Sequence, residues 1–342
     1  MQHEIVSPIP LLDEAGNLTE PGYAKRLLPV YDRSKIRGGA TRLKEWDYYL
    51  VMNDHFALAL TIADNSYMGL CSISLLDFDT QFQVTRSPMY LFPMGSTGLP
   101  VTSKVGDTAA SGKGYGIFFR NDGHRRQLIA HMDKFHDGKD LDAEIILSAE
   151  PEESMVICTP FDKPGHFYFN QKINCLRADG TVALGDKTYT FDPSYSFAVL
   201  DWGRGVWPYH NTWYWGSASG LLCGVPFGFN IGYGFGNTSA ATENMLFYAG
   251  KAHKLSEVTF HIPRRDGRED FLAPWTFESD DKRFEMTFSH VMDRASLTSA
   301  AFLKSDQHQV FGRFSGTAVL DDGTVLEVKD LMGFAEKVEN KW

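Results

Sequence analysis

The feature that most constrains the fold is an alternation of bulky and small residues over positions 227–236. The bulky positions are Phe227, Phe229, Ile231, Tyr233 and Phe235, and the positions between them are Gly228, Asn230, Gly232, Gly234 and Gly236. Successive side chains of a β-strand point to opposite faces, so a period of two predicts one continuous strand. Glycine lets other groups approach closely. We therefore expect the glycine face to lie against the strand of Trp213 and Trp215, or against an open cavity.

Strand patterns of the same kind recur in both halves of the chain, and turn residues separate them. They cover 47–52, 56–63, 67–76, 127–135, 141–147, 154–159, 166–177, 181–184, 187–191, 245–249, 257–262, 284–288, 310–320 and 324–328. Asp179-Gly180 and Asp322-Gly323 predict hairpin turns, and the alternating Gly112, Gly114 and Gly116 predict another strand with one bare face. No long segment shows helical periodicity, so the sequence predicts an all-β protein of barrels or sandwiches.

The length of 342 residues is sufficient for two domains. Prolines interrupt the first 30 residues and indicate an irregular lead-in, at Pro8, Pro10, Pro21 and Pro29. We predict an N-terminal barrel over residues 1–195, lead-in included, and a C-terminal barrel over residues 196–342. The two should meet between about residues 193 and 207.

The segment 201–215 reads D-W-G-R-G-V-W-P-Y-H-N-T-W-Y-W and joins the two predicted halves. Its glycines and Pro208 exclude a helix in the first half, and Trp213 and Trp215 share one face of a strand in the second. Asp201 and Arg204 lie among apolar neighbours, where an unpaired charge is costly. We expect both to be buried and to contact each other or a common polar partner.

The composition is that of a soluble globular protein, with 43% hydrophobic and 22% charged residues. A net charge of −10, with scattered Lys and Arg, argues against nucleic acid or an anionic membrane as a partner. The four cysteines are isolated and lie in apolar runs, as reduced core thiols do. The N-terminus does not resemble a signal peptide, and no apolar run is long enough to cross a bilayer. We expect a cytoplasmic protein; the oligomeric state stays open.

The central motif D-W-G-R-G-V-W-P-Y, with N-T-W-Y-W after it, resembles a widespread family catalogued as a domain of unknown function. The T-E-N at 242–244 and the G-F-A-E at 333–336 are similar to that family too, so the resemblance covers nearly the whole chain. F-Y-F-N at 167–170, Asp201 and the W-x-W at 213–215 are more distantly similar to proteins with two tandem lipocalin-like barrels. Carotenoid hydratases, tocopherol-cyclase-like enzymes and lipid-carrying survival factors belong to that group. The resemblance implies two antiparallel lipocalin-like (calycin) barrels with a site near the crossover. Val199 and Trp202 depart from the hydratase pattern, which has Trp at the first position and an acidic residue or His at the second.

Candidate catalytic residues are Asp201, His210 and Glu243. A carboxyl group in an aromatic wall is a possible proton donor, and a neutral His or a second carboxylate is a possible acceptor. Arg204 would position the acid or the ligand. The alternative is structural: Asp201 and Arg204 hold the corner together, and Glu243 bonds to the backbone at the end of a hairpin.

Candidate ligand-binding residues combine the aromatic side chains of the central segment with polar neighbours of the glycine-rich strand. Beside Arg204 they are Trp207, Tyr209, Trp213, Trp215, Asn230, Tyr233 and Asn244. The aromatic members also suit a simple core. The His and acidic residues show no H-E-x-x-H or His-x-His spacing, so we expect no metal site and no tightly bound cofactor.

Two functions from different classes remain open. The first is a cofactor-independent acid/base enzyme, such as a hydratase, cyclase, isomerase or lyase, acting on a small apolar or glycosidic molecule. The second is a non-catalytic binder or carrier of a lipid-like molecule. A pocket bordered by two or more ionisable side chains favours the enzyme, and a closed, wholly apolar cavity favours the carrier.

Overall fold

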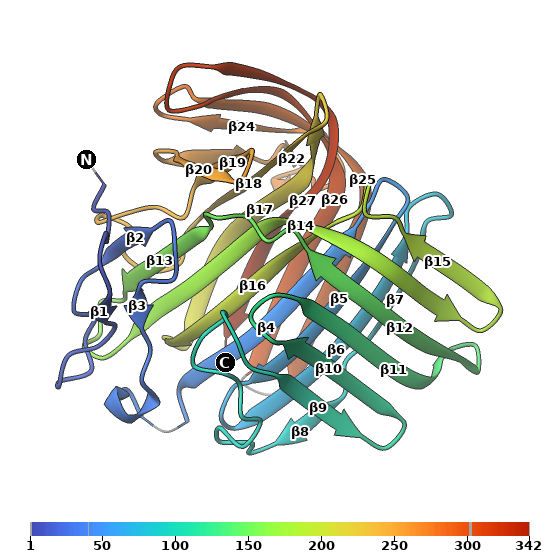
Figure 1. The fold of residues 1–342 in the computed structure, drawn as a ribbon, viewed down its shortest axis with the longest axis horizontal. Helices are drawn as coiled ribbons and strands as arrows, with labels where there is room; N and C mark the ends of the chain where they lie inside the picture. Colours follow the sequence, from blue (N-terminus) through green and yellow to red (C-terminus); the bar gives the residue numbers. More distant parts are fainter. Residues whose placement is uncertain (1, 40, 301–302, 342) are drawn as a thin grey trace.

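The computed structural model describes residues 2–39, 41–300 and 303–341. Within these ranges the protein is all-β, apart from one short 3-10 turn at Arg33–Lys35. Figure 1 shows two large curled sheets side by side. They form two tandem antiparallel lipocalin-like barrels, as the sequence predicts.

The first sheet has 14 strands in the described part of the chain. Its main path runs β7 (Phe82–Arg86), β6 (Met68–Asp77), β5 (Phe56–Asp64), β4 (Leu43–Met52), β16 (Phe197–Val206), β14 (Phe167–Leu184), β12 (Lys139–Ser148), β11 (Arg126–His136), β10 (Tyr115–Asn121) and β9 (Thr108–Gly112). Four strands pair off this path: β2 (Gly22–Ala24), β8 (Met89–Leu91), β13 (Met155–Pro160) and β15 (Lys187–Phe191).

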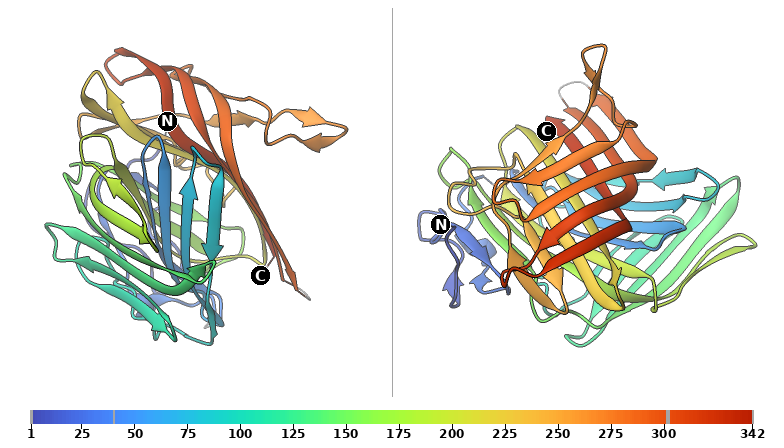
Figure 2. Two further views of the ribbon diagram at one scale, coloured as in Figure 1. Left: turned by 90° about the vertical axis from the view of Figure 1, so that its right-hand side faces the viewer. Right: turned by 90° about the horizontal axis from the view of Figure 1, so that it is seen from above.

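The second sheet has nine strands in the described residues. Their order is β20 (Lys251–Lys254), β19 (Met245–Tyr248), β18 (Val225–Tyr233), β17 (His210–Leu222), β27 (Val325–Lys341), β26 (Leu303–Val319), β25 (Phe284–Ala300), β24 (Trp275–Ser279) and β21 (Val258–His261). Two small ribbons complete the fold: parallel β1 (Ile9–Pro10) with β3 (Pro29–Val30), and antiparallel β22 (Arg264–Arg265) with β23 (Arg268–Glu269). Figure 2 shows the β22–β23 hairpin projecting from the second sheet.

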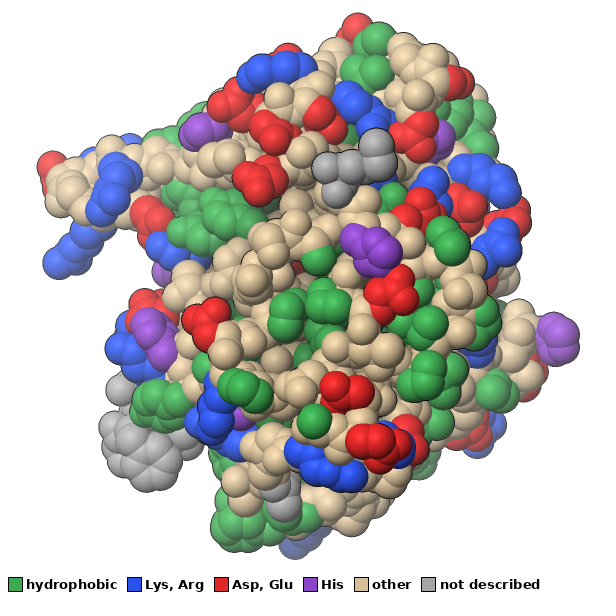
Figure 3. Space-filling model, turned by 90° about the vertical axis from the view of Figure 1, so that its left-hand side faces the viewer, with side chains coloured by type: hydrophobic (Ala, Val, Ile, Leu, Met, Phe, Trp, Pro, Cys, Tyr) green, Lys and Arg blue, Asp and Glu red, His purple; other side chains and the backbone are tan. Residues whose placement is uncertain are grey.

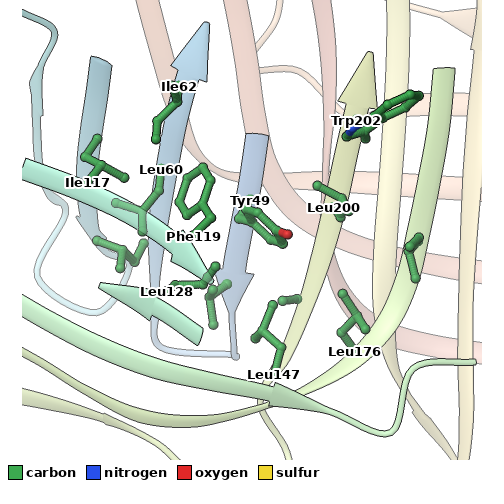
Figure 4. Close-up of a cluster of buried hydrophobic side chains, with 14 of the residues drawn as sticks. Tyr49, Leu60, Ile62, Ile117, Phe119, Leu128, Leu147, Leu176, Leu200 and Trp202 are labelled. Carbon is green, nitrogen blue, oxygen red and sulfur yellow. The ribbon is translucent and has the colours of Figure 1, made fainter. Parts of the chain in front are cut away.

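Each sheet wraps around its own hydrophobic core. Tyr49, Phe119 and Trp202 belong to the core of the first barrel, part of which is drawn in Figure 4. Phe229 and Phe314 belong to the core of the second, and their rings pack edge to face. Two further clusters of buried side chains draw on both sheets. They fix the outer face of the first sheet against the second.

The chain passes from one sheet to the other between Val206 and His210. The strand β16 is hydrogen-bonded between β14 and β4, so residues 197–206 complete the first sheet. The second sheet starts with β17. This places the crossover some ten residues after the predicted boundary at 195 and 196, at the end of the expected window. The division into two domains itself stays a prediction.

Three local predictions are corrected. Asp179 and Gly180 form no hairpin: β14 runs through both, and Gly180 faces β12 so closely that a Cβ would lie 2.2 Å from the Glu144 carbonyl oxygen. Gly112 and Gly114 belong to the β9–β10 hairpin rather than to one strand. The predicted strand 227–236 ends at Tyr233, because Gly234 and Gly236 have positive φ angles of 90° and 81° and turn the chain.

Charged side chains of both signs are scattered over the surface. On the face drawn in Figure 3, acidic and basic groups alternate with hydrophobic ones and with uncharged polar groups. Among the described residues, none forms a helix long and apolar enough to span a membrane.

Candidate functional site

A cavity of about 180 Å³ lies between the two sheets. The first sheet contributes side chains of β4, β5, β14 and β16, and the second contributes side chains of β17, β25, β26 and β27. The lining residues are Trp46, Tyr48, Thr61, Tyr168, Lys172, Asp201, Trp207, Trp213, Trp215, Phe235, Glu243, Arg294, Gln307, Gln309 and Glu336. One wall is aromatic and the other carries charge.

A buried ion pair forms the first-sheet side of the charged wall. Lys172 on β14 and Asp201 on β16 are direct cross-strand partners, and the Lys172 Nζ lies 3.0 Å from the Asp201 Oδ1. Asn170, two residues before Lys172 and so on the same face, donates to the same oxygen at 2.6 Å. Lys172 is 2% exposed and Asp201 is 8% exposed. Each charge therefore has its counter-charge inside the protein, which offsets the cost of burying it.

A single row of residues crosses the second sheet opposite this pair. The strand register aligns Arg294 with Gln309, Gln309 with Glu336, Glu336 with Trp215, and Trp215 with Gly232. The Lys172 Nζ lies 4.1 Å from the centre of a Trp215 ring, a cation–π contact between the sheets. The row thus places Trp215 directly beneath the ion pair.

Glu336 lies beside Trp215 in this row and is 4% exposed. Its Oε1 accepts a hydrogen bond from Trp213 Nε1 and its Oε2 accepts one from Gln309 Nε2, both at 3.0 Å. Burial raises the pKa of Glu336 to about 7, although the Trp213 hydrogen bond and the charges of Arg294 and Lys172 act against the shift. A carboxyl group with this pKa can take up and release protons near neutral pH.

Glu243 lies at the other side of Trp215, on the segment that follows β18. A Cβ on Gly232 would lie 2.9 Å from the Glu243 Oε1, so the carboxyl group occupies the space that this glycine leaves. Asn230 donates to the main-chain oxygen of Glu243 at 2.8 Å. Burial raises the pKa of Glu243, and the charge of Lys172 opposes the shift.

The aromatic wall consists of rings that pack against one another. Phe235 contacts three of them edge to face, with centroid distances of 4.6 Å to Trp207, 4.7 Å to Tyr168 and 5.5 Å to Trp213. Trp46 stacks on Tyr168 with an interplanar angle of 10°. Phe235 lies outside β18, which ends at Tyr233. The positive φ of Gly234 turns the chain after that strand, and the Phe235 ring joins the aromatic wall.

The structure brings five of the predicted site residues into the cavity lining: Asp201, Trp207, Trp213, Trp215 and Glu243. Asn230 and Asn244 lie behind it. Asn230 accepts from Trp215 Nε1 at 2.7 Å, and Asn244 accepts from the Gly232 amide at 2.7 Å. Both asparagines hold cavity residues in place.

Four predicted residues lie elsewhere. Tyr209 and His210 are exposed, and His210 lies 3.4 Å from Glu339. Tyr233 stacks on Tyr214 and packs against the core of the second barrel. Arg204 is fully buried on the other face of β16, among first-barrel residues.

The expected contact between Asp201 and Arg204 is corrected. Arg204 donates to Asp47 at 3.0 Å and to the carbonyl oxygens of Trp46, Gly203 and Pro100. Asp201 pairs with Lys172 instead. Three positions separate Asp201 from Arg204, and in a strand such residues face opposite sides.

Sequence reasoning missed Lys172, Glu336, Gln309 and Arg294. The family-like motifs F-Y-F-N and G-F-A-E contain or adjoin Tyr168, Lys172 and Glu336, so they were the available signal for three cavity residues. Arg294 and Gln309 carry no comparable signal, because only the register of β25, β26 and β27 places them in the row.

Comparison with solved structures supports the fold. The chain is similar to a putative AttH from Nitrosomonas europaea, with a TM-score of 0.51, 12% identity, and coverage of 86% of this chain and 92% of the other. It is similar to CghA with Sch210972, with a TM-score of 0.50, 12% identity, and coverage of 99% and 96%. Kievitone hydratase from Nectria haematococca aligns with a TM-score of 0.49, 11% identity, and 98% coverage of both chains.

Comparison by sequence gives the family. No curated protein matches the chain. The family model described as Domain of unknown function (DUF2804) matches residues 2–342, so the chain belongs to that family over nearly its whole length.

Proposed function

We propose that the protein is an enzyme that performs acid/base chemistry with its own side chains on a small, largely apolar molecule in the cavity between the sheets. The observation that carries the proposal is the convergence of Asp201, Glu243, Glu336 and Lys172 on one small space with an aromatic wall. Burying these charges costs stability, which a site for binding an apolar molecule alone does not require.

Asp201 and Glu243 lie in different surroundings, so we assign them different roles in the reaction. Asp201 pairs with Lys172 at 3.0 Å and accepts a hydrogen bond from Asn170 at 2.6 Å, which suits it to stabilise positive charge or to orient a polar group. Burial raises the pKa of Glu243 and so favours its protonated form, although the charge of Lys172 and the Asn230 side chain oppose the shift. Acid and base roles follow such differences in environment, so Glu243 is the proton donor. This reverses the roles that the sequence alone had suggested.

The aromatic wall supports the class of ligand. Trp46, Trp207, Trp213 and Phe235 offer ring faces and edges to an apolar or unsaturated molecule. The cavity of about 180 Å³ is below the ~300–1,000 Å³ typical of ligand pockets. It fits a compact molecule, or the reactive end of a longer one. The structural neighbour CghA, solved with Sch210972, supports a small-molecule site on this fold.

The same aromatic wall favours one other function, a carrier of an apolar molecule. Native mass spectrometry of freshly purified protein separates the two, because a carrier retains its cargo. Retained lipid-like cargo, released only on denaturation and unchanged in mass after long incubation, would favour the carrier.

Catalysis is tested with isotopic solvent. The protein is incubated with a mixture of prenylated phenols, monoterpene alkenes and cyclic enol ethers in D2O and, separately, in H2-18O. We expect carbon-bound deuterium in at least one compound, and its loss in Glu243→Gln. Glu327→Gln, on an exposed position of β27, is the matched control and should behave like the wild type. Equal labelling by wild type and Glu243→Gln would contradict the role of Glu243.

A further inference from the structure

We infer that Glu336 is a second catalytic group and works with Glu243 in a proton-in, proton-out reaction, so that the substrate is isomerised or cyclised without net addition of water. This inference rests on the proposed function and narrows it. Glu336 is not among the site residues predicted from the sequence. Of the reaction types that the sequence leaves open, isomerisation and cyclisation are the ones retained.

The two glutamates lie on one wall of the cavity. Glu336 and Gly232 are the direct neighbours of Trp215 on its two sides, and Glu243 lies over Gly232. Neighbouring strands lie about 4.8 Å apart, so the backbones of β27 and β18 are separated by about 10 Å. Both carboxyl groups thus approach a bound molecule from the second sheet, at two separated points.

The two glutamates differ in the hydrogen bonds that their carboxyl groups accept. Both oxygens of Glu336 accept a hydrogen bond, from Trp213 and from Gln309. These hydrogen bonds oppose the effect of burial, and with a pKa of about 7 part of Glu336 is ionised near neutral pH, which is the form that removes a proton. At Glu243 the Asn230 amide donates mainly to the main-chain oxygen, at 2.8 Å, and opposes the effect of burial less than Lys172 does. Burial raises the pKa of Glu243, so its carboxyl group keeps a proton to give. One wall therefore carries an acid and a base.

These positions define a balanced reaction. The Glu243 carboxyl group gives its proton to one carbon of a C=C bond, whose π electrons form the new C–H bond. The neighbouring carbon becomes electron-deficient; in a cyclisation, a second C=C bond of the substrate attacks it. The Glu336 carboxylate then removes a proton from an adjacent carbon, and the electrons of that C–H bond form a new C=C bond. The substrate keeps its atoms, and one proton returns from Glu336 to Glu243 through solvent at the half-buried rim of Thr61, Arg294 and Gln307.

The groups between the glutamates suit this reaction. The Asp201 side chain lines the space in which positive charge develops, and it is paired there with Lys172 at 3.0 Å. Ring faces of the aromatic wall stabilise positive charge as well. The acid and the base lie on the same wall, so both proton transfers take place on one side of the bound molecule.

The test uses the same alkene mixture with wild type, Glu243→Gln, Glu336→Gln and the control Glu327→Gln. We expect carbon-bound deuterium from D2O and no 18O from H2-18O. Glu336→Gln should slow formation of rearranged product by about 100- to 10,000-fold. Gln309→Leu, which removes one donor to Glu336, should move the pH profile to higher pH and leave the melting temperature within a few degrees. A control variant that loses activity would show that the effect is not specific to the cavity.

The outcomes separate the two proposals. Incorporation of 18O that depends on Glu243 would overturn the inference and leave the proposed function intact. Product formation at the wild-type rate by Glu336→Gln would do the same. The ionisation of both glutamates is measured in parallel by NMR of 13C-carboxyl-labelled protein, with the glutamine variants for assignment. If no compound is labelled and both carboxyl groups are ionised at pH 6, the inference and the proposed function both fail.

Discussion

At the scale of single residues, the charged wall shows how position changes the chemistry of one residue type. Glu336 and Glu327 lie on the same strand, β27, but Glu327 is exposed and Glu336 is 4% exposed. Burial penalises the ionised carboxylate of Glu336 and raises its pKa to about 7. A glutamate in the unfolded chain has a pKa near 4.3. The protein therefore binds a proton at Glu336 more tightly when folded.

This difference predicts the pH dependence of stability. The folded state holds more protons than the unfolded state between about pH 4.5 and 7, so the free energy of unfolding falls as pH rises through that window. The full effect of one such group is about 3.5 kcal/mol, from the pKa difference. In Glu336→Gln the melting temperature should fall less between pH 5 and 7.5 than in the wild type. Calorimetry at a series of pH values measures the melting temperatures of both proteins. Parallel plots of melting temperature against pH would contradict the prediction.

The ion pair of Lys172 and Asp201 predicts that substitutions at these two positions have non-additive effects on the free energy of unfolding. Asp201→Asn leaves the buried Lys172 without its counter-charge, and should cost about 1–3 kcal/mol, less than full removal of a partner because the amide keeps the shape. Lys172→Met should cost a similar amount. The double variant should cost less than the sum, by about 0.5–3 kcal/mol. Denaturant unfolding of all four proteins measures the coupling, and additive effects would show that the pair is not coupled.

At the scale of elements, the row across the second sheet depends on close contact between β17 and β18. A Cβ on Gly232 would lie 2.7 Å from the Tyr214 carbonyl oxygen and 2.9 Å from the Glu243 Oε1. Gly232→Val should therefore lower stability by about 1–3 kcal/mol and displace Glu243. Adding Glu243→Ala should recover part of the loss, since one of the two clashes disappears. A Gly232→Val protein with wild-type stability would show that the sheet yields at this point without cost.

The strand β14 pairs with β13 over residues 167–172 and with β12 over residues 177–184, and Gly180 lies inside the second of these stretches. Its φ of 153° and the 2.2 Å between a built Cβ and the Glu144 carbonyl oxygen leave no room for a side chain. We expect Gly180→Ala to cost about 3 kcal/mol or more, from strain and clash together. Gly323→Ala is the control: its φ is 86°, but nothing lies within 4 Å of the added carbon, so only the backbone term of about 1 kcal/mol applies. Equal losses in the two variants would contradict the clash.

At the scale of the whole molecule, local patterns predicted the elements and long-range register decided the site. The turn at Asp322 and Gly323 and most strands follow from alternation and turn residues, and the structure confirms them. The same reasoning failed at Asp179 and Gly180, because a glycine that turns a hairpin and one that lets a neighbouring strand approach closely look alike in sequence. Asp201 and the aromatic residues after it located the cavity from the sequence. The charged wall on the second sheet could not be predicted, since Arg294, Gln309 and Glu336 meet only through strand pairing between distant segments.

The two barrels share clusters of buried side chains, and this predicts how the molecule unfolds. Trp215 and Phe334 of the second sheet pack in one cluster with Tyr48 and Val199 of the first. Separating the barrels would expose these faces to water, so we expect one cooperative transition. Phe135→Ala in the first core and Phe314→Ala in the second each remove a fully buried ring.

Each of these two variants should lose about 3–5 kcal/mol and shift the whole calorimetric peak, with equal calorimetric and van't Hoff enthalpies. Matched losses are expected because both rings are buried in separate cores of the same kind. If the barrels unfold independently, each variant will move only its own part of the trace and split the peak in two. A split would show that the shared clusters are too weak to couple the cores, and that the cavity opens before either barrel unfolds.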